Sequence, residues 1–213
     1  MNFNDHSKLK GMHAFLGASK SSWLNYEGED ALYSRYKSQF ASVLGTALHE
    51  IAADYINYGF RLRKNNERYV LFELIEHKGI PRNVIDINYI FPNLATYVND
   101  AINFQMTTEQ VLYYSDNFYG TTDAICFDDK KRLLRIHDYK SGTTPAHMEQ
   151  LDIYSALFCL EYHVNPNDIS IEERIYQGNE ILYSNPEPEL IISIMDKAIE
   201  FDKMIDRFKK EGA

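Results

Sequence analysis

The chain has 213 residues, of which 45% are hydrophobic and 25% charged, and its formal net charge at pH 7 is -9. This composition predicts a soluble globular domain and excludes a disordered tail, a collagen-like or repeat protein and a small disulfide-stapled scaffold. No apolar run approaches the ~20 residues that cross a bilayer, and no apolar block near the start suggests a secretory signal. Cys126 and Cys159 lie outside CxxC spacing, which favours the cytoplasm and argues against a zinc or iron–sulfur site. The acidic balance argues against a general nucleic-acid binder.

Hydrophobic periodicity predicts a mixture of helices and strands along the chain. Residues 1–36 are expected to be irregular apart from a short helix at Ser21–Leu24. Helices are expected over 37–58, 70–77, 93–104, 147–162 and 187–210. Strands are expected over 110–114, 118–127, 132–140, 169–176 and 181–183. This order indicates an α/β (α+β) fold with a mixed central β-sheet flanked by helices. We expect one domain over 1–213, made of an N-terminal segment (1–36), a core (37–183) and a C-terminal helix (187–210).

Residues 119–142 (YGTTDAICFDDKKRLLRIHDYKSG) carry the strongest local signal for chemistry. With Asp128–Lys131 as a four-residue loop, strand alternation puts Asp123, Asp138 and Lys140 on one face. The two aspartates are then diagonal neighbours, roughly 7–8 Å apart at the backbone. Two carboxylates at that separation suit a hard cation such as Mg²⁺ or Mn²⁺, and Lys140 could polarise water or neutralise a phosphate. The alternative is a solvent-exposed hairpin whose charges alternate by chance, and a loop of different parity would separate the faces.

A histidine on the first long helix is a second candidate. Gly45 and His49 are four residues apart and share a helix face, and the glycine allows close approach of a sheet. The run beginning HE is not a zinc-protease motif, because Ala53 stands where HExxH requires histidine. Taken alone, a single helical histidine is more often a structural residue than a ligand.

Three further polar residues are candidates only in combination with the others. Gln150 and Tyr154 lie four apart on the helix after the DYK strand, although a surface glutamine above a core tyrosine is the simpler reading. Glu109 either supplies a further carboxylate from the edge of the first strand or is a solvated strand start. The sequence contains no P-loop, GxGxxG or GxSxG motif, so nucleotide-triphosphate hydrolysis and serine esterase chemistry have no support.

Taken in order, the motifs resemble the PD-(D/E)XK nuclease superfamily. They are GxxxH, GxxD, DYK and QxxxY, at Gly45–His49, Gly120–Asp123, Asp138–Lys140 and Gln150–Tyr154. Within the superfamily the pattern is similar to the RecB and AddB nuclease domains, the CRISPR-associated RecB-like exonucleases and related phage enzymes. The opening HAFLGASKSSWLN also resembles phage-type members, so the resemblance covers roughly residues 13–160.

The resemblance implies a restriction-endonuclease-like core and a set of site roles. The implied metal ligands are His49, Asp123, Asp138 and the main-chain carbonyl of Tyr139. The implied catalytic residues are Asp123, Asp138 and Lys140, with Lys140 positioning the nucleophilic water. Gln150 and Tyr154 would organise the site and contact the nucleic acid, with Glu109 as a further carboxylate.

The implied cofactor is Mg²⁺ or Mn²⁺, without an iron–sulfur cluster. Several relatives hold such a cluster on four cysteines, but Tyr26 stands where the first would be expected. Without a cluster, the N-terminal segment must be held by packing, with Trp23 as the expected anchor.

The implied function is a metal-dependent deoxyribonuclease, more an exonuclease than an endonuclease, acting on DNA ends in phage or mobile-element recombination in the host cytoplasm. The alternatives are a catalytically silent nuclease-fold module that binds DNA or protein, and a purely structural α/β protein. Because positive charge is scarce, we expect weak, salt-sensitive DNA binding unless a recombination partner or ring-shaped homo-oligomer assists. The residues able to track phosphates are Arg61, Arg63, Lys64, Arg68, Lys130, Lys131, Arg132 and Arg135.

Overall fold

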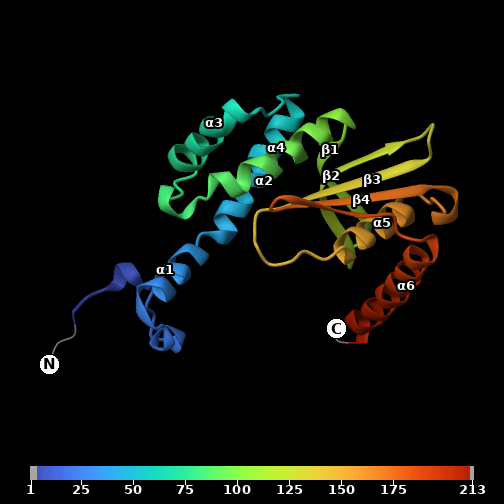
Figure 1. The fold of residues 1–213 in the computed structure, drawn as a ribbon. Coiled ribbons are helices and arrows are strands. Elements are labelled where there is room, and N and C mark those ends of the chain that lie inside the picture. Colours follow the sequence, from blue (N-terminus) through green and yellow to red (C-terminus); the bar gives the residue numbers. More distant parts are fainter. Residues whose placement is uncertain (1–3, 212–213) are drawn as a thin grey trace. The chain divides into compact units, whose positions relative to one another are not determined.

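The computed structural model describes residues 4–211, and Figure 1 traces them from the N-terminal helices to the long helix at the other end. The chain divides into two compact units, Met1–Ser42 and Val43–Ala213. This boundary falls near the expected end of the N-terminal segment, while the expectation of a single domain stays a prediction. Among the described residues, no helix combines the length and apolar character needed to span a membrane.

The N-terminal unit is built on aromatic contacts and contains no fully buried residue among those described. Its helix α1 covers Gly28–Ser38, where the sequence suggested irregular chain. Tyr36 contacts the rings of Phe15 and Phe40, at centroid distances of 6.3 and 5.3 Å. The expected short helix is confirmed as a 3₁₀ turn at Ser21–Asn25. Trp23 donates a hydrogen bond from Nε1 to the Gly17 carbonyl, 3.2 Å away.

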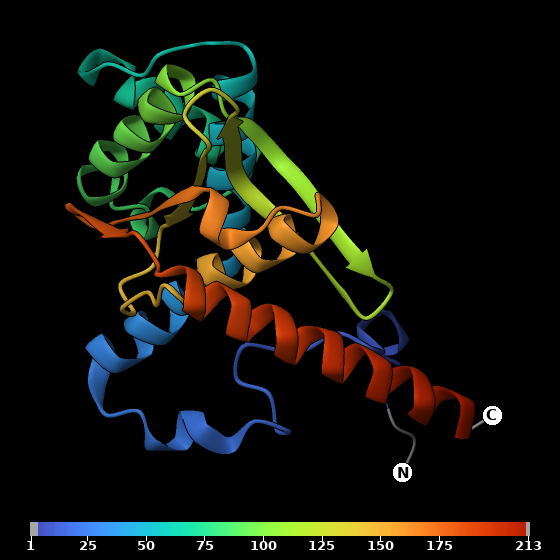
Figure 2. The ribbon, with the colours of Figure 1, turned by 90° about the vertical axis from the view of Figure 1, so that its right-hand side faces the viewer.

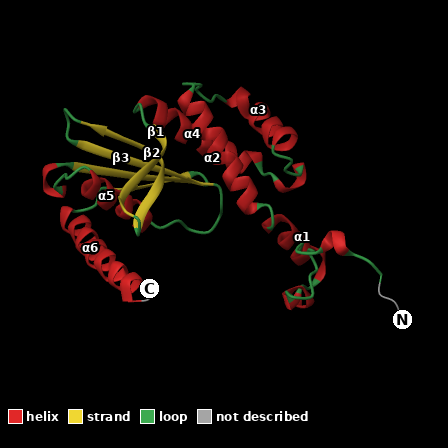
Figure 3. Cartoon of the chain, turned by 180° about the vertical axis from the view of Figure 1, so that it is seen from behind, coloured by secondary structure: helices red, strands yellow, loops and turns green. Residues whose placement is uncertain are grey.

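The second unit is a five-stranded mixed sheet flanked by helices, as the periodicity predicts (Figure 3). The strands lie in the order β1-β2-β3-β4-β5, and only the β3–β4 pair is parallel. Their bounds are Thr107–Ser115 (β1), Phe118–Asp128 (β2), Leu133–Lys140 (β3), Ser170–Gln177 (β4) and Glu180–Ser184 (β5). The parallel pair requires a crossover, which helix α5 (Glu149–Glu161) supplies.

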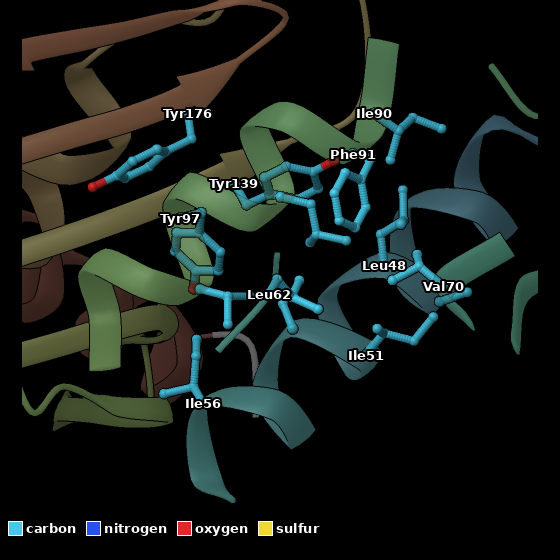
Figure 4. Close-up of a cluster of buried hydrophobic side chains, with 14 of the residues drawn as sticks. Leu48, Ile51, Ile56, Leu62, Val70, Ile90, Phe91, Tyr97, Tyr139 and Tyr176 are labelled. Atoms are coloured by element: carbon cyan, nitrogen blue, oxygen red, sulfur yellow. The ribbon is translucent and has the colours of Figure 1, made fainter. Parts of the chain in front are cut away.

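One face of the sheet packs against α2 (Ala41–Asn57) and α4 (Ile87–Asn103), and α3 (Glu67–Phe72) packs on α4. Figure 4 shows Leu48 and Ile51 of α2 and Tyr97 of α4 in one cluster with Tyr139 of β3. Tyr97 and Tyr139 stack with ring centroids 5.8 Å apart. This core holds α2, and therefore His49, against the sheet where the pairing of β2 with β3 ends.

The opposite face packs against α5 and α6 (Pro188–Glu211), which run alongside each other (Figure 2). Its core combines strand residues with α5 and the start of α6, for example Ile136, Leu157 and the fully buried Ile191. Burying whole Leu and Ile side chains contributes about 1.5–3 kcal/mol each, so this layer fixes α5 over the middle of the sheet.

The β2–β3 hairpin differs in register from the expected one. Ile125 pairs with Ile136 and Ala124 with His137, so the turn lies one residue later than predicted. The reason is Asp128, which stays in the strand while its Oδ1 accepts hydrogen bonds from the Lys130 and Lys131 amides, both at 3.1 Å. The register differs from the expected one by two residues, so the same side chains still share a face of the hairpin. Continued past the last pair, this register puts Asp123 opposite Asp138 rather than diagonal to it.

Helix α4 begins six residues before its expected start. Asp86 caps it, because its Oδ1 accepts a hydrogen bond from the Tyr89 amide at 3.2 Å. Pro92 is the sixth residue of the helix, beyond its first turn, so α4 lacks one i→i−4 hydrogen bond there. The remaining helices and strands begin and end close to the predicted residues.

Candidate metal centre

The β2–β3 ladder ends immediately before the two aspartates of interest. The last pair is Ala124 with His137, and beyond it the side chain of Asp123 bridges the strands. Its Oδ2 accepts a hydrogen bond from the backbone amide of Tyr139, 3.0 Å away. Asp123 thus takes the place of a main-chain acceptor and is held where the strands diverge.

Three side chains from three different elements meet at this gap. His49 Nδ1 of α2 lies 3.2 Å from Asp123 Oδ2 of β2. Glu109 of β1 joins them, so that one ligand atom from each residue lies within 4.8 Å of the other two. Residues 14 to 74 positions apart in sequence are therefore brought to one point by the sheet and by the core that fixes α2.

Glu109 reaches the gap through an unusual backbone. Its φ is +52°, in the left-handed region that non-glycine residues rarely adopt. The side-chain alternation of β1 reverses near Glu109. Thr108 donates a hydrogen bond to Asn57 of α2, whereas Leu112, which would share its face in a regular strand, packs in the core beneath α5. Such strain is typical of functional sites and costs on the order of 1–3 kcal/mol.

Asp138 and Lys140 form a second pair beside this cluster. Lys140 Nζ lies 2.9 Å from Asp138 Oδ1. The Asp138 side chain is only 4% exposed, and its Oδ2 has no hydrogen-bond partner in the described structure. Burial, followed by the charge of Asp123, raises the pKa of Asp138 to about 6. A buried oxygen without a partner, next to another carboxylate, is the environment that a cation would relieve.

The electrostatics of the cluster follow from crowded negative charge. Burial lowers the pKa of His49, but the hydrogen bond and charge of Asp123 outweigh it and the net shift is upward. Burial, then the charge of Asp123, raises the pKa of Glu109. The carboxylates therefore destabilise one another's charged forms, and His49 is the basic partner that compensates.

The two α5 residues reach the same site through Lys140. Lys140 Nζ donates to Gln150 Oε1 at 3.2 Å, and Gln150 Nε2 donates to the Tyr154 hydroxyl at 3.2 Å. Gly120 makes room for that ring, because a Cβ on it would lie 2.9 Å from Tyr154 Cε1. The glycine of GxxD thus has a steric role that its motif did not reveal.

Two residues of the motifs have more specific positions than the sequence indicated. The Tyr139 side chain points into the core and is 1% exposed, while its amide contacts Asp123. The role of its carbonyl as a ligand stays a prediction. At Gly45 of α2, an added Cβ would lie 3.5 Å from Ser141 Oγ, so the helix passes close to the end of the DYK segment.

The donor set fits a divalent cation that prefers oxygen. Carboxylates with one imidazole suit Mn²⁺ and, with more water, Mg²⁺, whereas zinc and iron–sulfur sites prefer thiolates or several imidazoles. Cys126 and Cys159 contribute nothing here: each belongs to a different hydrophobic core. Asp138 lies just outside the three-residue cluster, and its partner Lys140 contacts Gln150 of α5.

No protein-family model matches the chain, and no curated protein matches it. Among solved structures, the crystal structure of SSO0001 is 13% identical, with 72% of this chain and 84% of that chain covered at a TM-score of 0.32. A similarity of that size carries no argument about fold or function.

Proposed function

We propose that the protein is a metal-dependent nuclease that hydrolyses DNA phosphodiester bonds, in the manner of PD-(D/E)XK exonucleases. The observation that carries the proposal is the meeting of His49, Glu109 and Asp123 at one point, beside the Asp138–Lys140 pair. Motifs far apart in sequence supply these residues, and a purely structural protein has no need to concentrate carboxylates there.

The residues fit Mg²⁺ or Mn²⁺, with His49, Glu109, Asp123 and Asp138 as the side chains available to hold it. Bound there, the ion would lower the pKa of water and neutralise charge on the phosphate. His49 and Asp123 are already hydrogen-bonded, so their orientation is set before a ligand arrives.

Lys140 has the second role. Its ammonium group can orient the attacking water and offset the charge that develops on the phosphate. Asp138 and Gln150 hold Nζ from two sides, at 2.9 and 3.2 Å, and Tyr154 holds Gln150 in turn. These contacts make Gln150 and Tyr154 positioning residues for the lysine.

The net charge of -9 sets the conditions under which DNA is bound. With few cationic side chains to replace counterions, binding is weak and falls steeply with salt. A bound divalent cation locally reverses the sign of the field. We expect activity at low ionic strength, or with an assisting partner, in the cytoplasmic processing of DNA ends.

The test is cleavage of end-labelled linear DNA and of closed-circular DNA with Mn²⁺, Mg²⁺ or EDTA. We expect metal-dependent loss of the linear DNA, at least about 100-fold slower in Lys140→Met. Lys203→Met is the matched control, because Lys203 is exposed on α6 and belongs neither to the candidate site nor to the residues expected to track phosphates, so it should leave cleavage unchanged. If neither DNA is cut with either metal, the binding-only alternative takes precedence.

A further inference from the structure

Helix α6 has two apolar faces, of which one is left uncovered. Ile191 is fully buried and Met195 packs in the core beneath α5. A second stripe is largely exposed, with Leu190 at 46%, Phe201 at 48% and Phe208 at 57%. An amphipathic helix that served only to cover α5 would be polar on this side.

The exposed stripe forms one wall of a groove of about 530 Å³. The other wall comes from Ile153 of α5 and Phe118 at the start of β2. In Figure 2 the red helix α6 runs along the orange helix α5, and both helices contribute residues to the groove. The stripe of α6 residues that line it is Leu190, Ile194, Ala198, Phe201 and Ile205. Contiguous exposed apolar surface of this kind marks an interaction site.

The spacing of that stripe identifies the shape of its occupant. Its members follow one another by four, four, three and four residues, and Phe208 continues the row by three. This is the spacing at which one helix packs along another, with apolar residues every 3.5 positions. Over 24 residues α6 is about 36 Å long, enough to hold several turns of a second helix.

Charge identifies the chemistry of the occupant. The groove is bordered by Glu149, Asp152 and Asp202, against Lys197. Between Pro188 and Asp206, α6 carries five acidic side chains and two basic ones, whereas its last turn carries Arg207, Lys209 and Lys210 against Glu211, so the acidic border lies along the part of the helix before Arg207. A second copy of this chain, at -9, would be repelled, whereas a helix with a basic polar face would be attracted.

We propose that the groove between α5 and α6 binds a basic amphipathic helix of a partner protein. Leucine-like side chains of that helix fill the row from Leu190 to Ile205, and its lysines or arginines face the acidic border. The candidate metal ligands take no part, so this binding does not depend on nuclease activity. A partner held there would also supply the positive charge that the chain lacks.

The probe is a fluorescent synthetic peptide of about 18 residues, with leucine at heptad positions a and d and lysine elsewhere. A peptide with glutamate in place of lysine is its matched control. Anisotropy titration of the full chain should give saturable binding of the lysine peptide, at least about tenfold tighter than that of the glutamate peptide and weaker at high salt.

Phe201→Ser/Ile205→Ser should weaken binding of the lysine peptide at least about tenfold. Phe72→Ser, which removes an exposed phenylalanine of α3, should not. If the double variant unfolds, Ile205→Glu alone serves, since Ile205 is 37% exposed. Absence of saturable binding by wild type, or equal binding by the groove variant, would overturn the proposal. So would a dimer in sedimentation that the lysine peptide does not displace.

Discussion

The backbone amide of Tyr139 donates a hydrogen bond to Asp123 Oδ2 across 3.0 Å, at the point where the β2–β3 ladder has ended. The same carboxylate therefore links the two strands beyond their last backbone pair and contacts His49 in the candidate metal centre. The stability of the strands and the proposed metal binding therefore depend on the same side chain. The two roles can be separated, because the hydrogen bond to Tyr139 needs only an acceptor oxygen, whereas a cation needs the negative charge.

Asp123→Asn and Asp123→Ala separate these roles. Asparagine keeps an oxygen that can accept from Tyr139, so its free energy of unfolding should stay near that of wild type. Alanine leaves a largely buried amide without an acceptor and should cost about 1–3 kcal/mol. Urea unfolding followed by circular dichroism measures the difference. Equal loss in both variants would show that the charge, rather than the hydrogen bond, supports the strands.

Gly120→Ala tests the packing beneath Tyr154. The added methyl group would lie 2.9 Å from Tyr154 Cε1, so the ring must move and the Gln150 contact should be lost. We expect a loss of about 1–3 kcal/mol in stability together with slower cleavage. In a double-mutant cycle, Tyr154→Leu should recover most of the stability lost on the Gly120→Ala change. Additive effects of the two substitutions would place the strain elsewhere.

Glu109→Gly and Glu109→Ala test the left-handed residue of β1. Because glycine adopts a φ of +52° without a Cβ penalty, the glycine variant should be more stable than the alanine variant by about 1 kcal/mol. Both lose the carboxylate and should lose metal affinity equally. Chemical denaturation with and without Mn²⁺ measures both quantities. If the alanine variant were more stable than the glycine variant, the backbone at residue 109 would be unstrained.

Glu173 should make the protein less stable at high pH. It is fully buried on β4, where Ser155 Oγ donates to its Oε1 at 2.7 Å and Asp152 lies next to it. Burial raises its pKa from 4.5 to about 8. The folded chain therefore keeps a proton that the unfolded chain releases, so this contribution is complete below pH 4.5 and is lost as pH rises toward 8.

Urea midpoints measured from pH 5 to pH 9 should decline less in Glu173→Gln than in wild type. The exposed Glu189→Gln is the control and should decline as wild type does. Parallel profiles for wild type and Glu173→Gln would mean that Glu173 is already ionised in the folded protein.

Most of the sheet and its flanking helices could be predicted, because each element repeats apolar residues at its own period. Helix α1 could not, since its sequence GEDALYSRYKS has no apolar stripe and its residues are not buried. The turn begins one residue later than the sequence predicts. Asp128 is a typical turn residue, but here it stays in β2 while its side chain accepts hydrogen bonds from the amides of the turn that follows.

The candidate site was predictable in its residue types and less so in its geometry. The motifs pointed to His49, Asp123, Asp138 and Lys140, and the structure brings them together. The central position of Glu109 was not foreseeable, because it depends on a left-handed residue and a reversal of alternation in β1. The steric role of Gly120 likewise requires knowing where α5 crosses the sheet.

The most direct measurement is calorimetric titration of Mn²⁺ into the metal-free protein. One site is expected, lost in Asp123→Asn and His49→Ala and retained in Asp128→Asn, whose carboxylate lies at the far end of the same hairpin. Thermal unfolding of the same proteins should show stabilisation by Mn²⁺ only where the site is intact. Binding that is unchanged in Asp123→Asn, or absent from wild type, would contradict a metal centre at this gap and with it the proposed nuclease.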